Sequence, residues 1–327
     1  GLTQPDPSYH GLVYAEKFFD MVVDKHSYIT GDNSEWEHFG ADYILDAERT
    51  NCNCETCNAY NMMKLAKGLY MVTGKAKYLD FYERAFYNTI LSSQNPETGM
   101  TTYFQPMASG YFKVYGTAEG NFWCCTGSGM ENFTKLGNAI YYHTDDMVIV
   151  NQYLSSVLTD ADKNIKLTQT ANIPAENVAE FTINSIDGAA NVSSKLALRL
   201  PEWLAGNAEI TVNNVKVNPA IESGYAILES LKNNDRIAIT LPMEIKAYNL
   251  PDNEAEYAFK YGPIVLSAKL GTSNMTTSTT GVNVTIPSAK LIEDKYITDK
   301  SETISVINGT VAEFMANIND NLVKTEG

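Results

Sequence analysis

The spacing of apolar residues changes near Asp145, and this change constrains the fold more than any other feature. Before it, apolar residues recur at spacings of three and four, as in amphipathic helices; after it come short β-branched stretches divided by turn residues. A chain of 327 residues is long enough for two domains. We therefore predict an α+β multidomain protein, with a helical part over 1–145 and a β-sandwich region over 146–327 that could hold two subdomains.

Four or five helices are expected in the first part. The apolar spacing predicts helices over 12–26, over 58–74 with Gly74 as a C-cap, and over 77–94. The pair Ser128 and Glu131 matches the S-x-x-E capping box, which predicts a fourth helix that starts at Ser128 and reaches about residue 142.

Strands are expected in the second part. The stretches MVIVNQYL, NIKLTQTANI, EITVNNVKV and DRIAITLP are rich in β-branched residues and are separated by turn signals, which indicates a β-sandwich. The segment YAFKYGPIVLSAKL predicts a further buried strand pair. The Thr/Ser-rich stretch over 271–281 is expected to be a mobile loop.

Charge and hydropathy exclude several partners. The net charge of −15 argues against nucleic acid and against anionic membrane surfaces, and a neutral substrate fits it better. No apolar run approaches the roughly 20 residues of a membrane span. The chain starts without methionine, a basic stretch or an apolar signal core, so the cell location stays open.

The five cysteines all fall between residues 52 and 125. Adjacent residues such as Cys124 and Cys125 rarely form a disulfide with each other, because the bond demands a geometry that neighbours reach only with strain. Zinc binding by thiolates and a carboxylate is the favoured hypothesis. The alternative is a structural disulfide from Cys52 or Cys54, and those two cysteines also compete with Glu55 as the fourth ligand.

The two groups of candidate ligands are expected at two loop-to-helix junctions. Glu55 and Cys57 share a face only in an extended segment, so ETC should precede a helix that starts near Asn58. Cys124 and Cys125 should lie in a turn before the next helix, whose dipole favours thiolate. A site that includes a carboxylate would be poised for chemistry, whereas a closed four-cysteine site would be structural.

A proton donor is sought in the loop SEWEHFG, which offers Glu35 and Glu37. Either could equally be a solvated loop carboxylate. Trp36 and Trp123 flank the candidate catalytic groups and could stack on a substrate or simply pack in the core. His38 could donate a hydrogen bond to a substrate, although a lone histidine is more often structural.

The motifs ITG, ETCNAYNMMKL, YERAFYNTIL, YFQPM, CCTGSGME, RLPEW and YGPIVL resemble those of glycoside hydrolase families 127 and 146. Characterised members of this group are β-L-arabinofuranosidases. The likeness runs from about Tyr28 to the C-terminal residues. It implies an (α/α)6 barrel that carries the active site, followed by β-sandwich domains.

The resemblance also implies roles for particular residues. It implies a Zn²⁺ ion held by one glutamate and three cysteines, which fall on Glu55, Cys57, Cys124 and Cys125. It makes Cys124 the nucleophile, and the E-x-F pattern selects Glu37 as the acid/base. It places Glu83 and Tyr103 in contact with the sugar, and we add His38 and Trp123 as candidate sugar contacts. Cys52 and Cys54 are extra to this set.

A barrel of that type needs about twelve helices, so the chain is expected to hold only its last portion and to have weak or no activity alone. Three hypotheses compete. The first is a retaining glycosidase acting on a β-L-arabinofuranoside or similar pentofuranoside of a plant-type glycan. The second is a carbohydrate-binding module with a structural zinc site, and the third is a lyase that uses Glu37 and a tyrosine. The oligomeric state stays open.

Overall fold

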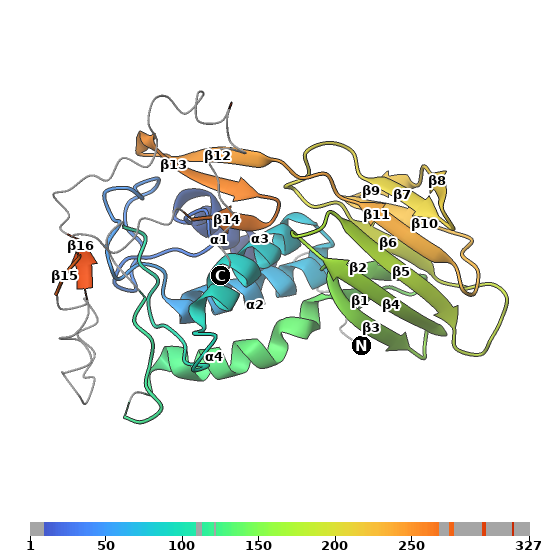
Figure 1. Cartoon of the computed structure of the whole chain (residues 1–327), viewed down its shortest axis with the longest axis horizontal. Helices are drawn as coiled ribbons and strands as arrows, with labels where there is room; N and C mark the ends of the chain where they lie inside the picture. The colour runs from blue at the N-terminus through green and yellow to red at the C-terminus, as the bar shows by residue number, and fades with distance from the viewer. Residues whose placement is uncertain are drawn as a thin grey trace.

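The computed structural model describes residues 10–108, 113–120 and 122–267, together with 275–277, 296–298 and 316. The helices come first in the chain and the strands follow them, so the fold is α+β, as predicted (Figure 1). Most of the loop expected over 271–281 lies outside the described residues. No helix among the residues described is long and apolar enough to cross a membrane.

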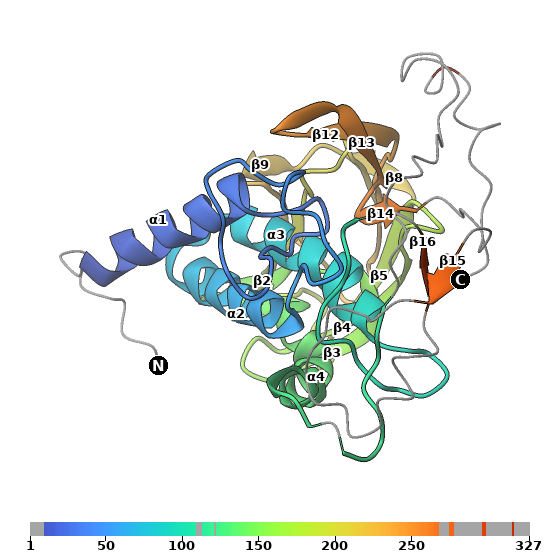
Figure 2. The same cartoon turned by 90° about the vertical axis from the view of Figure 1, so that its left-hand side faces the viewer.

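The helices are α1 (His10–Lys25), α2 (Thr56–Thr73), α3 (Lys77–Ala85) and α4 (Cys124–Lys135). The first three, α1, α2 and α3, lie where the apolar spacing predicts helices. Gly74 ends α2 in the left-handed conformation, and its N–H donates to the carbonyl of Tyr70, as expected of a C-cap. Helix α3 continues as a π-helical turn over Phe86–Ile90 and a 3-10 turn over Leu91–Ser93. In Figure 2, α1 lies on the outer side of the helical part, next to α2.

The prediction for the fourth helix is wrong at both ends. Helix α4 begins at Cys124, after an extended Trp123, so Ser128 lies inside the helix and caps nothing. Glu131 does not complete a capping box, because its carboxylate accepts a hydrogen bond from Tyr60 of α2. After Lys135 the chain forms only a 3-10 turn over Leu136–Ala139 before the first strand.

Two antiparallel-rich sheets form the β-sandwich. One has the order β1-β2-β6-β10-β9 and the other β3-β4-β5-β11-β7-β8, and the pair β2–β6 is parallel. The strands of the first sheet are β1 (Tyr141–His143), β2 (Met147–Val150), β6 (Lys195–Arg199), β9 (Ala220–Glu222) and β10 (Tyr225–Leu228). Those of the second are β3 (Leu154–Asp160), β4 (Ile165–Asn172), β5 (Val178–Ser185), β7 (Glu209–Val212), β8 (Val215–Val217) and β11 (Arg236–Thr240).

The five-stranded sheet is buried on both faces. Successive side chains of a strand point to opposite faces. In β10, Tyr225 and Ile227 join the core of the helical part, whereas Ala226 and Leu228 join the core between the two sheets. This double burial explains why all four residues of β10 are buried. The sheet therefore docks the sandwich directly onto α2 and α3.

A third sheet packs on the helical part. Its strands are β12 (Ile245–Leu250), β13 (Asn253–Tyr261) and β14 (Ile264–Leu266). They confirm the strand pair expected from YAFKYGPIVLSAKL, although most residues of these strands are only partly buried. Asn88 of the π-helical turn donates to the carbonyl of Pro263 and accepts from the N–H of Val265. At the hairpin turn, the Asp252 carboxylate accepts hydrogen bonds from the N–H groups of Asp46 and Ala47. The remaining described strands, β15 (Met275–Thr277) and β16 (Tyr296–Thr298), pair with each other.

Candidate active site and metal centre

The start of α2 positions the first two candidate ligands. Glu55 is the N-cap residue and has extended backbone angles, as expected, but Cys57 lies within the first turn of the helix rather than before it. The backbone here is held by Thr56, whose N–H donates to the carbonyl of Tyr103 over 3.0 Å. The Thr56 hydroxyl also donates to the carbonyl of Thr102 over 3.0 Å.

The start of α4 positions the other two. Cys124 and Cys125 are the first residues of the helix, not part of a preceding turn as expected. Gly129 lets this helix approach the neighbouring loop, because a Cβ atom there would lie 2.9 Å from the Thr101 hydroxyl. The positive ends of two helix dipoles therefore meet at the thiols, which favours their ionised form.

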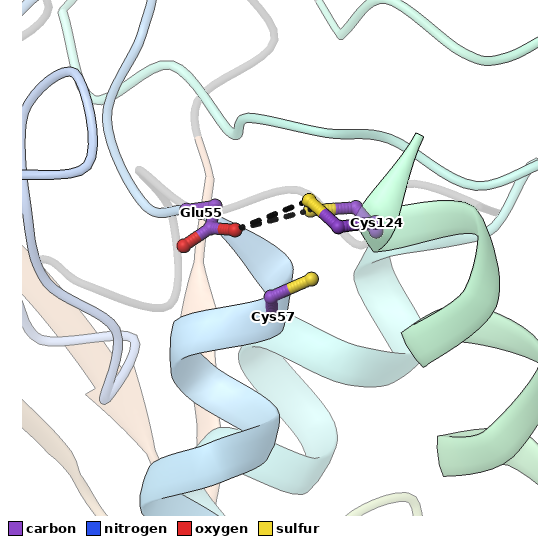
Figure 3. A group of neighbouring side chains, drawn as sticks. Glu55, Cys57 and Cys124 are labelled. Carbon is purple, nitrogen blue, oxygen red and sulfur yellow. Dashed lines mark hydrogen bonds between the residues drawn. The ribbon is translucent and has the colours of Figure 1, made fainter. Parts of the chain in front are cut away.

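The four side chains form one cluster that could hold a metal ion. All four candidate ligand atoms lie within 4.8 Å of one another. Figure 3 shows the Glu55 carboxylate and the sulfurs of Cys57 and Cys124 pointing toward one another from the ends of α2 and α4. Cys57 and Cys125 are buried, whereas Cys124 is exposed.

The spacing within the cluster fits a tetrahedral ion. Zinc bonds of about 2.3 Å to sulfur and about 2.0 Å to oxygen place two sulfurs about 3.8 Å apart, and sulfur and oxygen about 3.5 Å apart. The sulfurs of Cys124 and Cys125 are 3.9 Å apart. The Glu55 oxygen lies 3.7 Å from the Cys124 sulfur and 3.5 Å from the Cys125 sulfur. The donor set and its geometry therefore suit zinc.

The three thiols of the cluster shift one another's pKa values. A hydrogen bond from Cys125, aided by one from Ser128, lowers the pKa of Cys57. The same bond to Cys57, together with burial, raises the pKa of Cys125. Burial also raises the pKa of Cys124. Metal binding by all three sulfurs must therefore displace protons, so the metal affinity of this cluster falls as the pH is lowered.

Tyr103 connects the cluster to Glu37. The Tyr103 hydroxyl donates a short hydrogen bond to the Glu37 carboxylate. The same hydroxyl oxygen lies 3.5 Å from the Cys124 sulfur. Burial, followed by the hydrogen bonds to Cys124 and Glu37, raises the pKa of Tyr103 well above its usual value, so the phenol keeps its proton.

A tight turn presents Glu37. Mutual backbone hydrogen bonds join Glu35 and His38, so Trp36 and Glu37 form a two-residue hairpin loop. Both have positive φ, 47° and 66°, a conformation that such turns usually assign to Asn-Gly. Bulky residues in this conformation carry strain, which is typical of functional sites. The carboxylate of Glu35 accepts instead from the hydroxyl of Thr50.

The aromatic candidates differ in exposure. Trp36 is 43% exposed and His38 is exposed in the same turn, so both are open to a ligand. Trp123 is 9% exposed, with its ring edge against Tyr103. Trp123 therefore supports Tyr103 from behind more than it faces solvent.

Cys52 and Cys54 do not join the cluster. Both are fully buried, Cys52 beside Phe104 and Cys54 beside Tyr28. All five cysteines are free, so the alternative of a structural disulfide is wrong.

Glu83 faces the β-sandwich. One carboxylate oxygen lies 2.6 Å from the Arg199 guanidinium, and the other accepts from the indole N–H of Trp203 over 2.7 Å. Trp203 is buried in the core of the β-sandwich. The structure thus brings together six predicted residues and leaves Glu83 in a separate network; the six are Glu37, Glu55, Cys57, Tyr103, Cys124 and Cys125.

Ser128 lies next to the cluster and was not among the site residues expected from the sequence. The Ser128 hydroxyl lies 3.0 Å from the Cys57 sulfur. The signal was present in the spacing, because residues four apart share a helix face and Ser128 follows Cys124 by four. Because Ser128 was assigned to a capping box, its contact with Cys57 was not predicted.

Comparisons with known proteins show that the chain is similar to members of a glycoside hydrolase family. Models for the catalytic and middle domains of family 127 (GH127) β-L-arabinofuranosidases match residues 6–138 and 147–243. The chain belongs to the GH127 family, which confirms the resemblance found in its motifs.

Individual relatives agree. A non-reducing end β-L-arabinofuranosidase of Bifidobacterium longum subsp. longum is 22% identical over 279 residues, which are 78% of this chain and 41% of the relative. A solved GH127 β-L-arabinofuranosidase from Geobacillus stearothermophilus T6 matches with a TM-score of 0.64 and 24% identity over 76% of this chain and 41% of that one. A solved GH127 β-arabinofuranosidase gives a TM-score of 0.67 and 26% identity over 76% and 42%. The chain thus spans less than half the length of these relatives.

Proposed function

We propose that this chain carries the catalytic cysteine, the acid/base and the zinc ligands of a retaining glycoside hydrolase that releases β-L-arabinofuranose, or a similar pentofuranoside, from an arabinose-containing glycan. The observation that supports this most is the position of Tyr103, whose hydroxyl contacts both the Glu37 carboxylate and the exposed thiol of Cys124. The names of the GH127 relatives support the sugar. The net charge of −15 suits a neutral substrate.

Glu55, Cys57, Cys124 and Cys125 would hold the zinc ion. When bound, zinc would keep the thiols ionised at neutral pH, where a free cysteine is only a few per cent thiolate. Three of the four side chains would serve as fixed ligands. Cys124 is the exposed member, so its sulfur is the one within reach of a substrate.

The reaction proceeds in two displacements. In the first, the Cys124 sulfur bonds to the anomeric carbon while the glycosidic C–O bond breaks, and Glu37 gives its proton to the departing oxygen. In the second, Glu37 takes a proton from water, whose oxygen bonds to the anomeric carbon as the C–S bond breaks. Two inversions give net retention, and Glu37 ends protonated as it began.

The shared contact with Tyr103 supports this assignment. The Glu37 carboxylate and the Cys124 sulfur both contact the Tyr103 hydroxyl, so the two groups lie close together, as the paired groups of a retaining enzyme do. Tyr103 contacts both groups and would also contact the sugar. Trp36 and His38 lie exposed beside Glu37 and would contact the sugar or the group it leaves.

We also propose that the helices of this chain form part of an (α/α)6 barrel, whose other helices lie outside the described residues. The share of the relatives' length that is covered, 41% and 42%, supports this proposal. Helix α1 adds support, because its Val13, Tyr14 and Phe18 are 44–70% exposed and would be covered by further helices.

Trapping of the cysteine tests the mechanism. In Glu37→Gln, an aryl β-L-arabinofuranoside with an activated leaving group still reacts with Cys124, but removal of the sugar is slowed, because no base activates water. We expect intact-protein mass spectrometry to show a gain of one pentosyl unit that maps to Cys124. The double variant with Cys124→Ser should show no gain. A pentosyl unit on another residue contradicts the proposal. The proposal is also contradicted if the zinc-loaded Glu37→Gln variant never acquires the adduct and Cys124→Ser leaves sugar binding unchanged.

A further inference from the structure

We infer that Ser128 is a positioning residue of the metal centre, which donates a hydrogen bond to the Cys57 thiolate and holds that sulfur in place as a zinc ligand. The inference rests on the proposed zinc site and concerns a residue outside the four ligands. Its basis is the 3.0 Å separation between the Ser128 hydroxyl oxygen and the Cys57 sulfur.

The contact belongs to a regular helix pairing. Cys57 and Tyr60 lie three residues apart on α2, and their partners Ser128 and Glu131 lie three residues apart on α4. Both pairs therefore face each other across the same two helices, one turn apart. The Tyr60 hydroxyl donates to Glu131 over 3.0 Å, so a second and separate bond joins the same two helices one turn away.

The chemistry fixes the direction of the bond. A thiolate bound to metal has no proton, so in the metal-bound centre the hydroxyl must be the donor. Hydrogen bonds from outside the ligand set orient metal ligands, and their loss typically weakens metal binding by ~10–100-fold. Ser128 also lies one helical turn after Cys124, so α4 supplies this donor together with two ligands.

The hydroxyls of Ser128 and Tyr103 contact different sulfurs of the cluster. Ser128 contacts Cys57, whose side chain is almost buried, and no catalytic candidate shares that hydroxyl. Tyr103 contacts Cys124, which is exposed, and Tyr103 is bound to Glu37 at the same time. Ser128 is therefore linked to the sulfur that stays in place, and Tyr103 to the sulfur that reacts.

Metal affinity tests the inference without any need for turnover. Zinc is titrated into the reduced, metal-free chain in competition with a chromophoric chelator. We expect Ser128→Ala to weaken zinc binding by ~10–100-fold and Ser128→Thr, which keeps the hydroxyl, to restore most of it. Tyr60→Phe is the matched control, because it removes the neighbouring bond between α2 and α4 without touching a ligand. Its zinc affinity should equal that of the wild type.

Cobalt(II) supplies a spectroscopic readout. In the cobalt-loaded chain we expect the thiolate-to-metal charge-transfer band to shift in Ser128→Ala and to stay unchanged in Tyr60→Phe. Wild-type affinity and an unshifted band in Ser128→Ala overturn the inference and leave the metal site standing. Equal weakening in Tyr60→Phe also overturns it, since helix packing then explains the effect. If the reduced wild type binds neither zinc nor cobalt, the proposed zinc site fails and the inference fails with it.

Discussion

The guanidinium of Arg199 lies 2.6 Å from the carboxylate of Glu83, and neither side chain is more than 4% exposed. Arg199 belongs to strand β6 and Glu83 to helix α3, so the ion pair joins the sandwich to the helical part. Asp80, one turn earlier on α3, binds the same guanidinium. A network this buried is expected to hold the two parts together.

Glu83→Ala should therefore lower the free energy of unfolding by about 3–5 kcal/mol, because it leaves the buried Arg199 with one partner fewer. Urea unfolding of the chain measures this. Glu209→Ala is the control, since Glu209 and its ion-pair partner Lys216 are 53% and 60% exposed, and it should cost no more than about 1 kcal/mol. Unchanged stability together with lost sugar binding would instead support the sugar contact that the sequence motifs implied for Glu83.

The burial of Asp80 should make the free energy of unfolding depend on pH. Burial, opposed by Arg199, raises the pKa of Asp80 to about 6. A carboxyl whose pKa is raised on folding stabilises the fold fully only below its unfolded value of about 3.9 and loses that contribution as the pH rises through its folded value. The free energy of unfolding of the wild type, relative to Asp80→Asn, should fall by about 2 kcal/mol between pH 4 and 7. A difference that is constant with pH, measured by urea unfolding, would contradict this.

Glu37 and Glu35 form a matched pair in one turn. Glu37→Gln should lower kcat by ~10²–10⁴-fold on a β-L-arabinofuranoside with a poor leaving group, because general acid catalysis contributes about that much. Glu35→Gln should change kcat only a few-fold, since that carboxylate is bound to Thr50 and not to Tyr103. Steady-state kinetics on both variants checks this. The reverse order would assign the acid/base to Glu35.

Metal removal should destabilise the protein. A chelator, applied with the thiols kept reduced, is expected to lower the melting temperature by about 5 °C or more, and added zinc should restore it, because a ligand that binds only the folded state stabilises it. Calorimetry with metal analysis measures both changes. The chelator should leave the melting temperature of Cys57→Ser unchanged. A chelator effect as large in that variant as in the wild type would place the metal elsewhere.

Turnover by the isolated chain should be at least ~100-fold below that of a full-length GH127 relative, because small displacements of a bound sugar cost that much when a pocket is incomplete. The chain spans 41% of the curated relative, which motivates this expectation. Parallel assays on one arabinofuranoside test it. Comparable turnover would show that these residues suffice for catalysis.

Local patterns predicted much of the secondary structure. Apolar spacing located α1, α2 and α3, and Gly74 marked the end of α2, because helix periodicity and a left-handed cap depend on neighbours in sequence. The start of α4 was mispredicted for the same reason. Ser128 and Glu131 match a capping box locally, yet their partners are Cys57 and Tyr60 of another helix.

The sequence alone indicated the family to which the chain belongs, and the resemblance to that family pointed to three cysteines and a glutamate as candidate metal ligands. Tertiary structure decided which atoms meet. Two helix ends converge to place Glu55 and Cys57 against Cys124 and Cys125, while Arg199 turns Glu83 toward the sandwich. Residue types and short spacings are local properties of the chain. These contacts depend instead on how α2, α4 and the five-stranded sheet pack, and no short stretch of sequence specifies that packing.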